Sequence, residues 1–343
     1  MVATTNTDGM RDAGARDDGA DVGIVLIGRN EGERLVACLR SIAPLGLPIV
    51  YVDSASTDGS QAVARDAGAH VLDLDLTRPF TAARARHEGA MALIAQGPGL
   101  RYIQFIDGDC ALAPGWIEAA RRFLEAAPDY AVACGRRRER RPDASLYNRL
   151  ADIEWDTPVG DAPACGGDSL IRITAYRAVG GFDPTLIAGE EPELCSRLTR
   201  AGWRIRRLDA EMTVHDAAMT RLGQYWRRAV RSGFGYAQAW RTTRSHPHPL
   251  YGRELVRACG WTLIPLLLSI VGGLAVHPAA WLLAPAIYAL QVARLSSRFG
   301  AGHVASWQRA ALLTLAKAAE TWGALRYFGR LARGHAGGTI LYK

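Results

Sequence analysis

The 343-residue chain lacks the sequence features of several protein classes. Its six cysteines show no CxxC spacing, which excludes a disulfide framework and a zinc knuckle and predicts reduced thiols in a cytosolic compartment. No apolar stretch occurs in residues 1–21, so a disordered lead-in is expected there and not a secretory signal peptide. Hydrophobic residues make up 49% of the chain and charged residues 22%, which excludes a wholly disordered protein, a collagen and a simple coiled coil.

Acidic residues are almost absent from the last third of the chain. Residues 221–343 contain 16 lysines and arginines but only two acids, Glu254 and Glu320. The basic residues border the uncharged run 258–293 and do not alternate with exposed stacking aromatics, so we predict contact with membrane lipids and no nucleic-acid partner. Because a single core rarely grows beyond about 250–300 residues, one large domain followed by this separate region is expected.

Two apolar segments in this run, 258–276 and 279–293, predict a pair of helices joined at His277-Pro278. The first is long enough to cross a bilayer, and the alternative is a buried helical pair packed on the preceding domain. Arginines stand on both sides of the pair, which places both of its ends at the cytoplasmic face by the positive-inside rule. Residues 307–333 mix apolar and basic side chains and are expected along the membrane interface.

Strands and helices alternate over the first part of the chain. This alternation predicts an α/β fold with a mainly parallel sheet and helices on both of its faces. No GxGxxG motif follows the first strand, which argues against a dinucleotide-binding oxidoreductase. The expected strands are 22–30, 48–52, 70–74 and 101–106, and the expected helices are 31–43, 61–67 and 81–95.

Polar clusters follow three of these strands, at positions 28–31, 53–56 and 107–109. Ligands of such sheets bind beyond the carboxyl ends of the strands, so these clusters should meet at one edge. Asp107 and Asp109 are separated by one glycine, and two anions in a cleft require a cation. We therefore predict Mg²⁺ or Mn²⁺ there, and the alternative is an Asp-Gly turn that merely ends the strand.

Two later segments have distinctive patterns. Residues 135–161 are polar and rich in arginine, which predicts a loop and a helix covering the site; the arginines are either a solvated face or a phosphate-binding group. Residues 189–192 predict the start of a helix, with a proline at the first helical position and Gly202 at its end. Acidic residues complement a helix N-terminus, so Glu190 and Glu191 have a structural explanation as well as a chemical one.

Six segments, taken in order, resemble the family 2 glycosyltransferases, whose catalytic domains have the GT-A nucleotide-sugar fold. The resemblance covers about residues 22–240 and implies an inverting transferase that uses a nucleotide-diphosphate sugar, with a UDP-sugar favoured. It divides the chain into the lead-in 1–21, a GT-A catalytic domain 22–240 and a helical membrane-associated region 241–343. The segments are VGIVLIGRNEGERLVACLRSI, VYVDSASTDGSQAVA, ARARHEGAMAL, RYIQFIDGDCALAPGWI, GGDSLIRITAYRAVGGFDPTL and GEEPELCSRLTRAGWRI.

The resemblance also implies roles for individual residues. For His215 and Trp226 a structural explanation stands beside the implied role, because a lone histidine or an aromatic on a helix face is often structural. The implied nucleotide-sugar ligands are Asn30, Glu31, Asp53, Arg86 and Asp107, the metal ligands are Asp107, Asp109 and His215, the acceptor-binding residues are Gly167, Asp168 and Trp226, and the catalytic base is Glu191 or Glu190.

Glu191 replaces the aspartate of the family's Glu-Asp pair, which leaves the choice of base between Glu190 and Glu191 open. Residues 224–228 are similar to the QxxRW motif of processive synthases but end in arginine, which argues for transfer of a single sugar. Arg227, Arg228 and Arg231 are candidates for contact with a diphosphate or with lipid headgroups. The resemblance implies a glycan or lipid-linked acceptor, in polysaccharide or glycolipid synthesis at the cytoplasmic face of the inner membrane. Two alternatives are a polyprenyl-phosphate sugar synthase and a non-catalytic nucleotide-sugar-binding scaffold. Such a scaffold should have lost Asp107, Asp109 or Glu191, and the chain retains all three.

Overall fold

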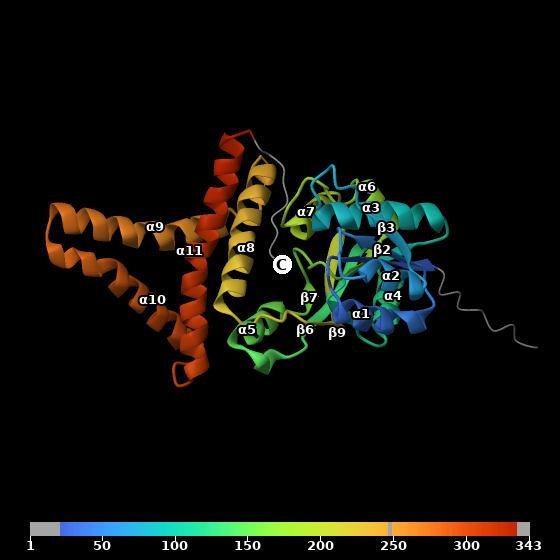
Figure 1. Ribbon diagram of the computed structural model, residues 1–343, viewed down its shortest axis with the longest axis horizontal. Coiled ribbons are helices and arrows are strands. Elements are labelled where there is room, and N and C mark those ends of the chain that lie inside the picture. Colours follow the sequence, from blue (N-terminus) through green and yellow to red (C-terminus); the bar gives the residue numbers. More distant parts are fainter. Residues whose placement is uncertain (1–20, 246–248, 335–343) are drawn as a thin grey trace, which may run out of the picture.

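The computed structural model describes residues 21–245 and 249–334. It consists of an α/β domain built on one sheet and a C-terminal group of long helices (Figure 1). Of the predicted lead-in, residues 1–20 lie outside the described part of the chain, so its disorder stays a prediction.

The first four strands pair in parallel, as the alternation of elements predicts. β1 lies between β2 and β4, and β3 follows β2. All residues of β1 and β4 except the last of each are buried, because both faces of the sheet are covered there. The bounds are β1 Val22–Gly28, α1 Glu33–Ile42, β2 Ile49–Asp53, α2 Ser60–Asp66, β3 His70–Asp73, α3 Ala82–Gln96 and β4 Tyr102–Asp107.

The second half of the sheet adds antiparallel pairs, so the sheet as a whole is mixed. Its strands follow the order β3-β2-β1-β4-β8-β6-β9-β5, with β7 paired to β9. β8 runs antiparallel to both β4 and β6, whereas β6 and β9 are parallel to each other. The bounds are β5 Cys110–Leu112, α4 Trp116–Ala126, β6 Tyr130–Glu139, α5 Leu146–Trp155, β7 Gly160–Asp161, β8 Ser169–Arg172, α6 Ile173–Ala178, α7 Glu190–Arg200 and β9 Arg204–His215.

The arginine run forms part of strand β6 and not the predicted loop. Successive side chains of a strand point to opposite faces, so the middle arginine is separated from its neighbours. Arg137 lines the cavity at the edge where the polar clusters meet, while Arg136 and Arg138 pair with Asp152 and Glu211. Consecutive charges hide the alternation that identifies a strand, which is why the sequence pattern missed it.

Two apolar layers, one on each face of the sheet, hold the α/β domain together. α1 and α4 contribute to one layer, and α3, α6 and α7 contribute to the other. In the first, Trp116 Nε1 donates to Gln104 Oε1 at 2.8 Å, which satisfies a buried polar pair. Gly89 of α3 lets that helix approach the sheet closely, since a Cβ there would lie 2.7 Å from both Val25 and Val52. These layers fix the strand ends that carry the polar clusters.

Four long helices follow the sheet. α8 and α11 pack so closely at Gly233 and Gly323 that a Cβ on either glycine would overlap the backbone of the partner helix. α8 therefore has one face on α11, and Figure 1 shows it standing between α11 and the α/β domain. The bounds are α8 Leu222–Thr243, α9 Gly252–Ala275, α10 Leu283–Arg298 and α11 Val304–Ala332.

α9 and α10 form a hairpin that extends away from the α/β domain (Figure 1). By length and composition, Gly252–Ala275 and Pro278–Arg298 can each cross a membrane, with mean hydropathies of 1.8 and 1.2. In each segment, only 17% of the apolar 18-residue stretch is buried, which contradicts the alternative of a helical pair buried against the preceding domain. α11 packs against both helices of the hairpin, and the second helix continues to Arg298, beyond the predicted end at 293.

Candidate active site

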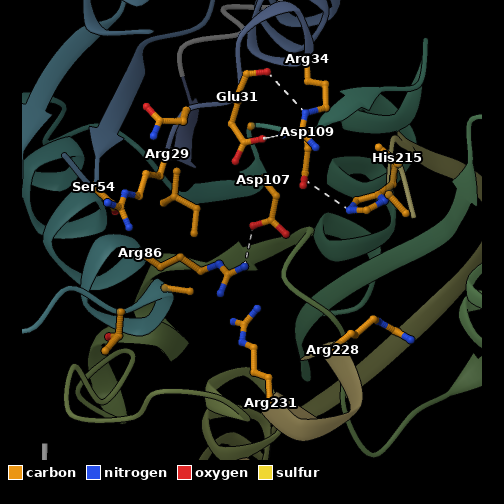
Figure 2. Close-up of a pocket in the computed structure, with 18 of the residues that line it drawn as sticks. Arg29, Glu31, Arg34, Ser54, Arg86, Asp107, Asp109, His215, Arg228 and Arg231 are labelled. Atoms are coloured by element: carbon orange, nitrogen blue, oxygen red, sulfur yellow. Dashed lines mark hydrogen bonds and ion pairs between the residues drawn. The ribbon is translucent and has the colours of Figure 1, made fainter. Parts of the chain in front are cut away.

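A cavity of about 780 Å³ opens at the carboxyl ends of β1 and β4, where the predicted polar clusters meet. The loops after β1 and β2, strand β6 and helices α3, α5, α7 and α8 contribute side chains to its wall. Figure 2 shows Asp107 and Asp109 near its centre, with Arg86 and Arg231 on one side and His215 on another. Segments far apart in the sequence thus build one polar site.

Asn30 and Asp53 join two loops at one end of the cavity. The Asn30 N–H donates to Ser56 Oγ at 2.9 Å. Asp53 is buried and accepts hydrogen bonds from the Tyr51 hydroxyl at 2.9 Å and the Ser56 N–H at 2.7 Å. Asn30 lines the cavity, whereas Asp53 lies behind it and fixes the loop that carries the lining residue Ser54. Direct nucleotide contact by these two residues stays a prediction.

Arg86 connects the predicted metal and base sites. Its guanidinium group is 3% exposed and lies 2.7 Å from Asp107 Oδ1, 2.7 Å from Glu190 Oε1 and 3.3 Å from Glu191 Oε1. Burial alone would lower the pKa of Arg86, but the three carboxylates raise it, so the group stays charged. Arg86 lines the cavity together with Glu31, and contact of either residue with the nucleotide sugar stays a prediction.

Asp107 lies between two guanidinium groups and is not an unpaired anion. Arg86 contacts one carboxylate oxygen, and Arg137 Nη2 lies 3.1 Å from the other. Burial would raise the pKa of Asp107, but the two arginines outweigh it and hold the pKa well below its usual range. Arginines therefore already supply part of the positive charge that the pair of aspartates requires. Arg137 was not recognised from the sequence because it stands in a run of similar charges.

Asp109 and His215 form the other half of the predicted metal site. Asp109 Oδ1 lies 3.4 Å from His215 Nε2, and Cys110 Sγ belongs to the same group of ligand atoms, all within 4.8 Å of one another. His215 Nδ1, the other ring nitrogen, lies 3.7 Å from Glu139 Oε2, so Nε2 is the nitrogen that faces Asp109. A carboxylate oxygen beside an imidazole nitrogen suits Mn²⁺ and fits Mg²⁺ less well. The side chains of Asp109 and His215 thus fit a divalent ion.

Glu190 and Glu191 begin helix α7, where Gly189 turns the chain with a φ of 81°. Pro192 is at the third helical position and not at the predicted first. Glu190 is tied to Arg86 at 2.7 Å, whereas Glu191 approaches the same group only at 3.3 Å. Burial, reinforced by the charge of Glu190, raises the pKa of Glu191 to about 7. A carboxyl that titrates near neutral pH is suited to accept a proton.

The three residues implied for the acceptor do not line the cavity. Asp168 is buried beneath it, where Oδ1 accepts from the Asp107 N–H at 3.0 Å and Oδ2 accepts from a threonine hydroxyl of β9 at 2.7 Å. Gly167 leaves space for Arg86, because a Cβ there would overlap the guanidinium group. Trp226 packs in an apolar cluster of α5, α8 and α11. The structure places all three behind the wall, so their contact with an acceptor stays a prediction.

On the α5 and α8 side of the cavity, Trp155 was missed by sequence analysis, whereas the arginines of α8 are the ones predicted to contact a diphosphate or lipid headgroups. Trp155, at the end of α5, faces the cavity, with the Arg137 guanidinium 5.2 Å from its ring centroid and the His215 ring at 4.7 Å. The α8 residues recur at helical spacing, which the sequence contains but does not connect to a cavity. They are Gln224, Arg227, Arg228 and Arg231.

Comparison with known proteins identifies relatives of this chain. The glycosyl transferase family 2 model matches residues 24–166, and the glycosyl transferase family group 2 model matches residues 102–293. The succinoglycan biosynthesis protein ExoA of Rhizobium meliloti (strain 1021) is 27% identical over 316 residues, which cover 87% of this chain and 92% of that protein. The pre-mycofactocin glycosyltransferase of Mycobacterium tuberculosis is 29% identical over 274 residues, which are 74% of this chain and 54% of that longer protein.

A solved structure shows the same fold. The mannosyltransferase PcManGT from Pyrobaculum calidifontis, in complex with GDP-Man and Mn²⁺, aligns with a TM-score of 0.60 at 18% sequence identity, over 90% of this chain and 87% of that chain. The mixed sheet with flanking helices is therefore a GT-A domain, as the resemblance implies. Since the family group model spans more than half of the chain and the family 2 model matches its first half, the protein belongs to the family 2 glycosyltransferases.

Proposed function

We propose that this glycosyltransferase is an inverting, metal-dependent enzyme that transfers one sugar from a nucleotide-diphosphate sugar to an acceptor hydroxyl. The observation that supports it best is the position of Glu191, whose pKa is raised to about 7, in the same cavity as Asp107 and Asp109. An inverting transfer needs a base on one side of the anomeric carbon and charge stabilisation on the other. The cavity offers both.

Glu191 is the proposed general base. Its carboxylate takes the proton of the acceptor hydroxyl while that oxygen bonds to the anomeric carbon, and the bond from that carbon to the diphosphate oxygen breaks with inversion. Glu190 is the weaker candidate because its carboxylate is committed to Arg86 at 2.7 Å. A base with a pKa near the working pH is partly deprotonated and still accepts a proton effectively, which favours Glu191 over a fully ionised carboxylate.

The nucleotide end of the donor is proposed to lie at the loops that Asn30 and Asp53 hold together, and its diphosphate near Asp109 and His215. These last two residues would hold the divalent ion, which supplies positive charge for the departing diphosphate. Mn²⁺ in the structure of PcManGT supports use of a divalent ion, although that structure is related in fold only. Arg137 places a further positive charge at the same point and keeps Asp107 ionised.

The acceptor is proposed to be a glycan or lipid-linked saccharide, in synthesis of a cell-surface polysaccharide or glycolipid. ExoA, similar over most of this chain, is a succinoglycan biosynthesis protein. The exposed hairpin of α9 and α10 would hold the enzyme in the membrane, with the α/β domain at its cytoplasmic face. Arg253 and Arg257 precede the apolar run, and Arg294 and Arg298 follow it, which favours this orientation.

A panel of nucleotide sugars tests the proposal directly. Full-length protein in detergent is heated with each of several UDP-, GDP- and dTDP-sugars, with and without Mn²⁺, and its unfolding temperature is measured. We expect one nucleotide class to stabilise the protein, more strongly with Mn²⁺ than without it. That donor is then incubated with membrane extract to detect transfer. Stabilisation without any transfer would support a nucleotide-sugar-binding scaffold, and no stabilisation by any donor would contradict the proposal.

A further inference from the structure

Two cysteine thiols are in contact beside the cavity. Cys165 Sγ and Cys195 Sγ lie 3.6 Å apart, although 30 residues separate them in the chain. Cys195 is buried in α7, whereas Cys165 is half-buried in the segment between β7 and β8, next to the exposed Gly166. Because Cys165 is partly exposed, a small reagent can reach the pair from that side.

The two thiols differ in acidity. A hydrogen bond from Cys195 lowers the pKa of Cys165, and the opposing effect of burial is smaller. The pKa of Cys195 is raised, by its contact with Cys165 and by burial. A third thiol, Cys134, is buried and donates to the Arg206 carbonyl oxygen at 3.6 Å. Thiolates react with oxidants and thiols do not, so Cys165 is the reactive member and Cys195 is the thiol placed to react with its oxidation product.

Each cysteine of the pair is close to a residue of the proposed catalytic machinery. Cys195 lies four residues after Glu191, on the same face of α7. Cys165 lies two residues before Gly167, where a Cβ would overlap the Arg86 guanidinium group. The charges of Glu191 and Arg86 both act on the Cys165 thiol. A covalent link between the two cysteines would therefore join the segment that supports Arg86 to the helix that begins with the proposed base.

We propose that Cys165 and Cys195 form a reversible disulfide when the protein reacts with a peroxide. The Cys165 thiolate attacks one oxygen of hydrogen peroxide, the O–O bond breaks with loss of hydroxide, and Cys165 becomes a sulfenic acid. Cys195 loses its proton, and its sulfur bonds to the Cys165 sulfur and displaces the sulfenic oxygen as hydroxide. The two thiol protons neutralise the two hydroxides, so two thiols are oxidised, one peroxide is reduced, and one disulfide and two water molecules result.

The bond would change the geometry of the site. A disulfide is about 2.05 Å long, so the two sulfurs must approach each other by about 1.5 Å. Such a movement shifts α7 relative to the segment that supports Arg86, and displacements of about 1 Å can lower turnover about 10²-fold. A reversible disulfide also suits a cytosolic protein, where disulfides are usually transient. The loss of transfer rests on the proposed function, whereas formation of the bond does not.

The test follows the bond and the activity separately. Full-length protein in detergent is treated with hydrogen peroxide, with and without later reduction by dithiothreitol. One portion is denatured in iodoacetamide to block free thiols, and its peptides are mapped by mass spectrometry. The other portion is assayed for transfer from the donor that the panel identifies to membrane extract. The variants are Cys165→Ala and Cys195→Ala, and Cys259→Ala is the matched control, because Cys259 is also half-buried but lies in α9.

We expect a peptide in which Cys165 is joined to Cys195, and a fall in transfer of about 10-fold or more that dithiothreitol reverses. The alanine variants of the pair should keep their transfer in peroxide, and Cys259→Ala should be inhibited like the unaltered protein. Recovery of Cys165 and Cys195 as blocked thiols after peroxide, or a bond from either to Cys134, would refute the pair in the unaltered protein without reference to any variant. A joined pair with unchanged transfer would refute its effect on the site. Failure of the proposed function would appear earlier, as absence of transfer by the untreated protein.

Discussion

Replacing Glu191 with glutamine should remove activity and at the same time stabilise the fold. The pKa of this carboxyl is raised from 4.5 to about 7, so the folded state holds its proton more tightly than the unfolded state does. Stability from this group is fully present below pH 4.5 and is lost as the pH rises through about 7. The shift corresponds to about 3 kcal/mol of stability lost at pH 8, most of which glutamine should restore.

The same substitution should reduce transfer by about 10²-fold or more, the scale of general-base catalysis. Glutamine keeps the size and polarity of the side chain but cannot accept the proton. In the unaltered enzyme, kcat/KM should increase with pH up to about 7 as Glu191 loses its proton, and the variant should lack this dependence. Nucleotide affinity should hardly change, because Asn30, Asp109 and His215 lie elsewhere in the cavity.

Glu190→Gln is the matched control and should have the opposite effect on stability. Glu190 is buried and lies 2.7 Å from Arg86, so its removal leaves a buried guanidinium with one partner fewer. Losing one member of a buried pair costs about 3–5 kcal/mol. Unfolding at pH 8 and at pH 5, together with initial rates of transfer, measures both effects. Full activity in Glu191→Gln, or equal destabilisation by both substitutions, would refute the assignment of Glu191 as base.

Three further predictions concern the metal, the support of Arg86 and the hairpin. Asp109→Asn should abolish Mn²⁺-dependent stabilisation by the donor and transfer, with the unfolding temperature of the ligand-free protein unchanged; unaltered turnover would contradict the metal assignment. Gly167→Ala should displace Arg86 and lower turnover at least 10-fold, because the new Cβ overlaps the guanidinium group. Normal activity and stability in this variant would show that Arg86 can adopt another conformation at no cost. The full-length protein should remain in the membrane pellet after a salt wash, whereas deletion of residues 258–293 should release it. A chain that ends near residue 250 would also lack α11 and expose the apolar face of α8, so the internal deletion is the better test.

The sequence determined the first half of the fold and the location of the site. Repeated strand-and-helix units with polar residues after each strand require a parallel arrangement, and this brings residues 28–31 and 107–109 to one edge. The order of the motifs identified the family. The apolar run with arginines on both sides, and few acids beyond residue 220, predicted a helical hairpin. These features depend on local periodicity and composition, which a sequence displays directly.

Only the tertiary structure decided how the charges of the site are balanced. The pairing of Asp107 with Arg137 depends on strand β6 lying two places from β4 in the sheet, and antiparallel β8 between them cannot be ordered from local pattern. The pKa of Glu191 depends on its depth of burial and its distances to Glu190 and Arg86. The position of α8 between the cavity and the helical region depends on α11, about 90 residues later, which covers the other face of α8. Electrostatic energies vary with distance and burial between residues far apart in the chain, and the sequence contains neither quantity.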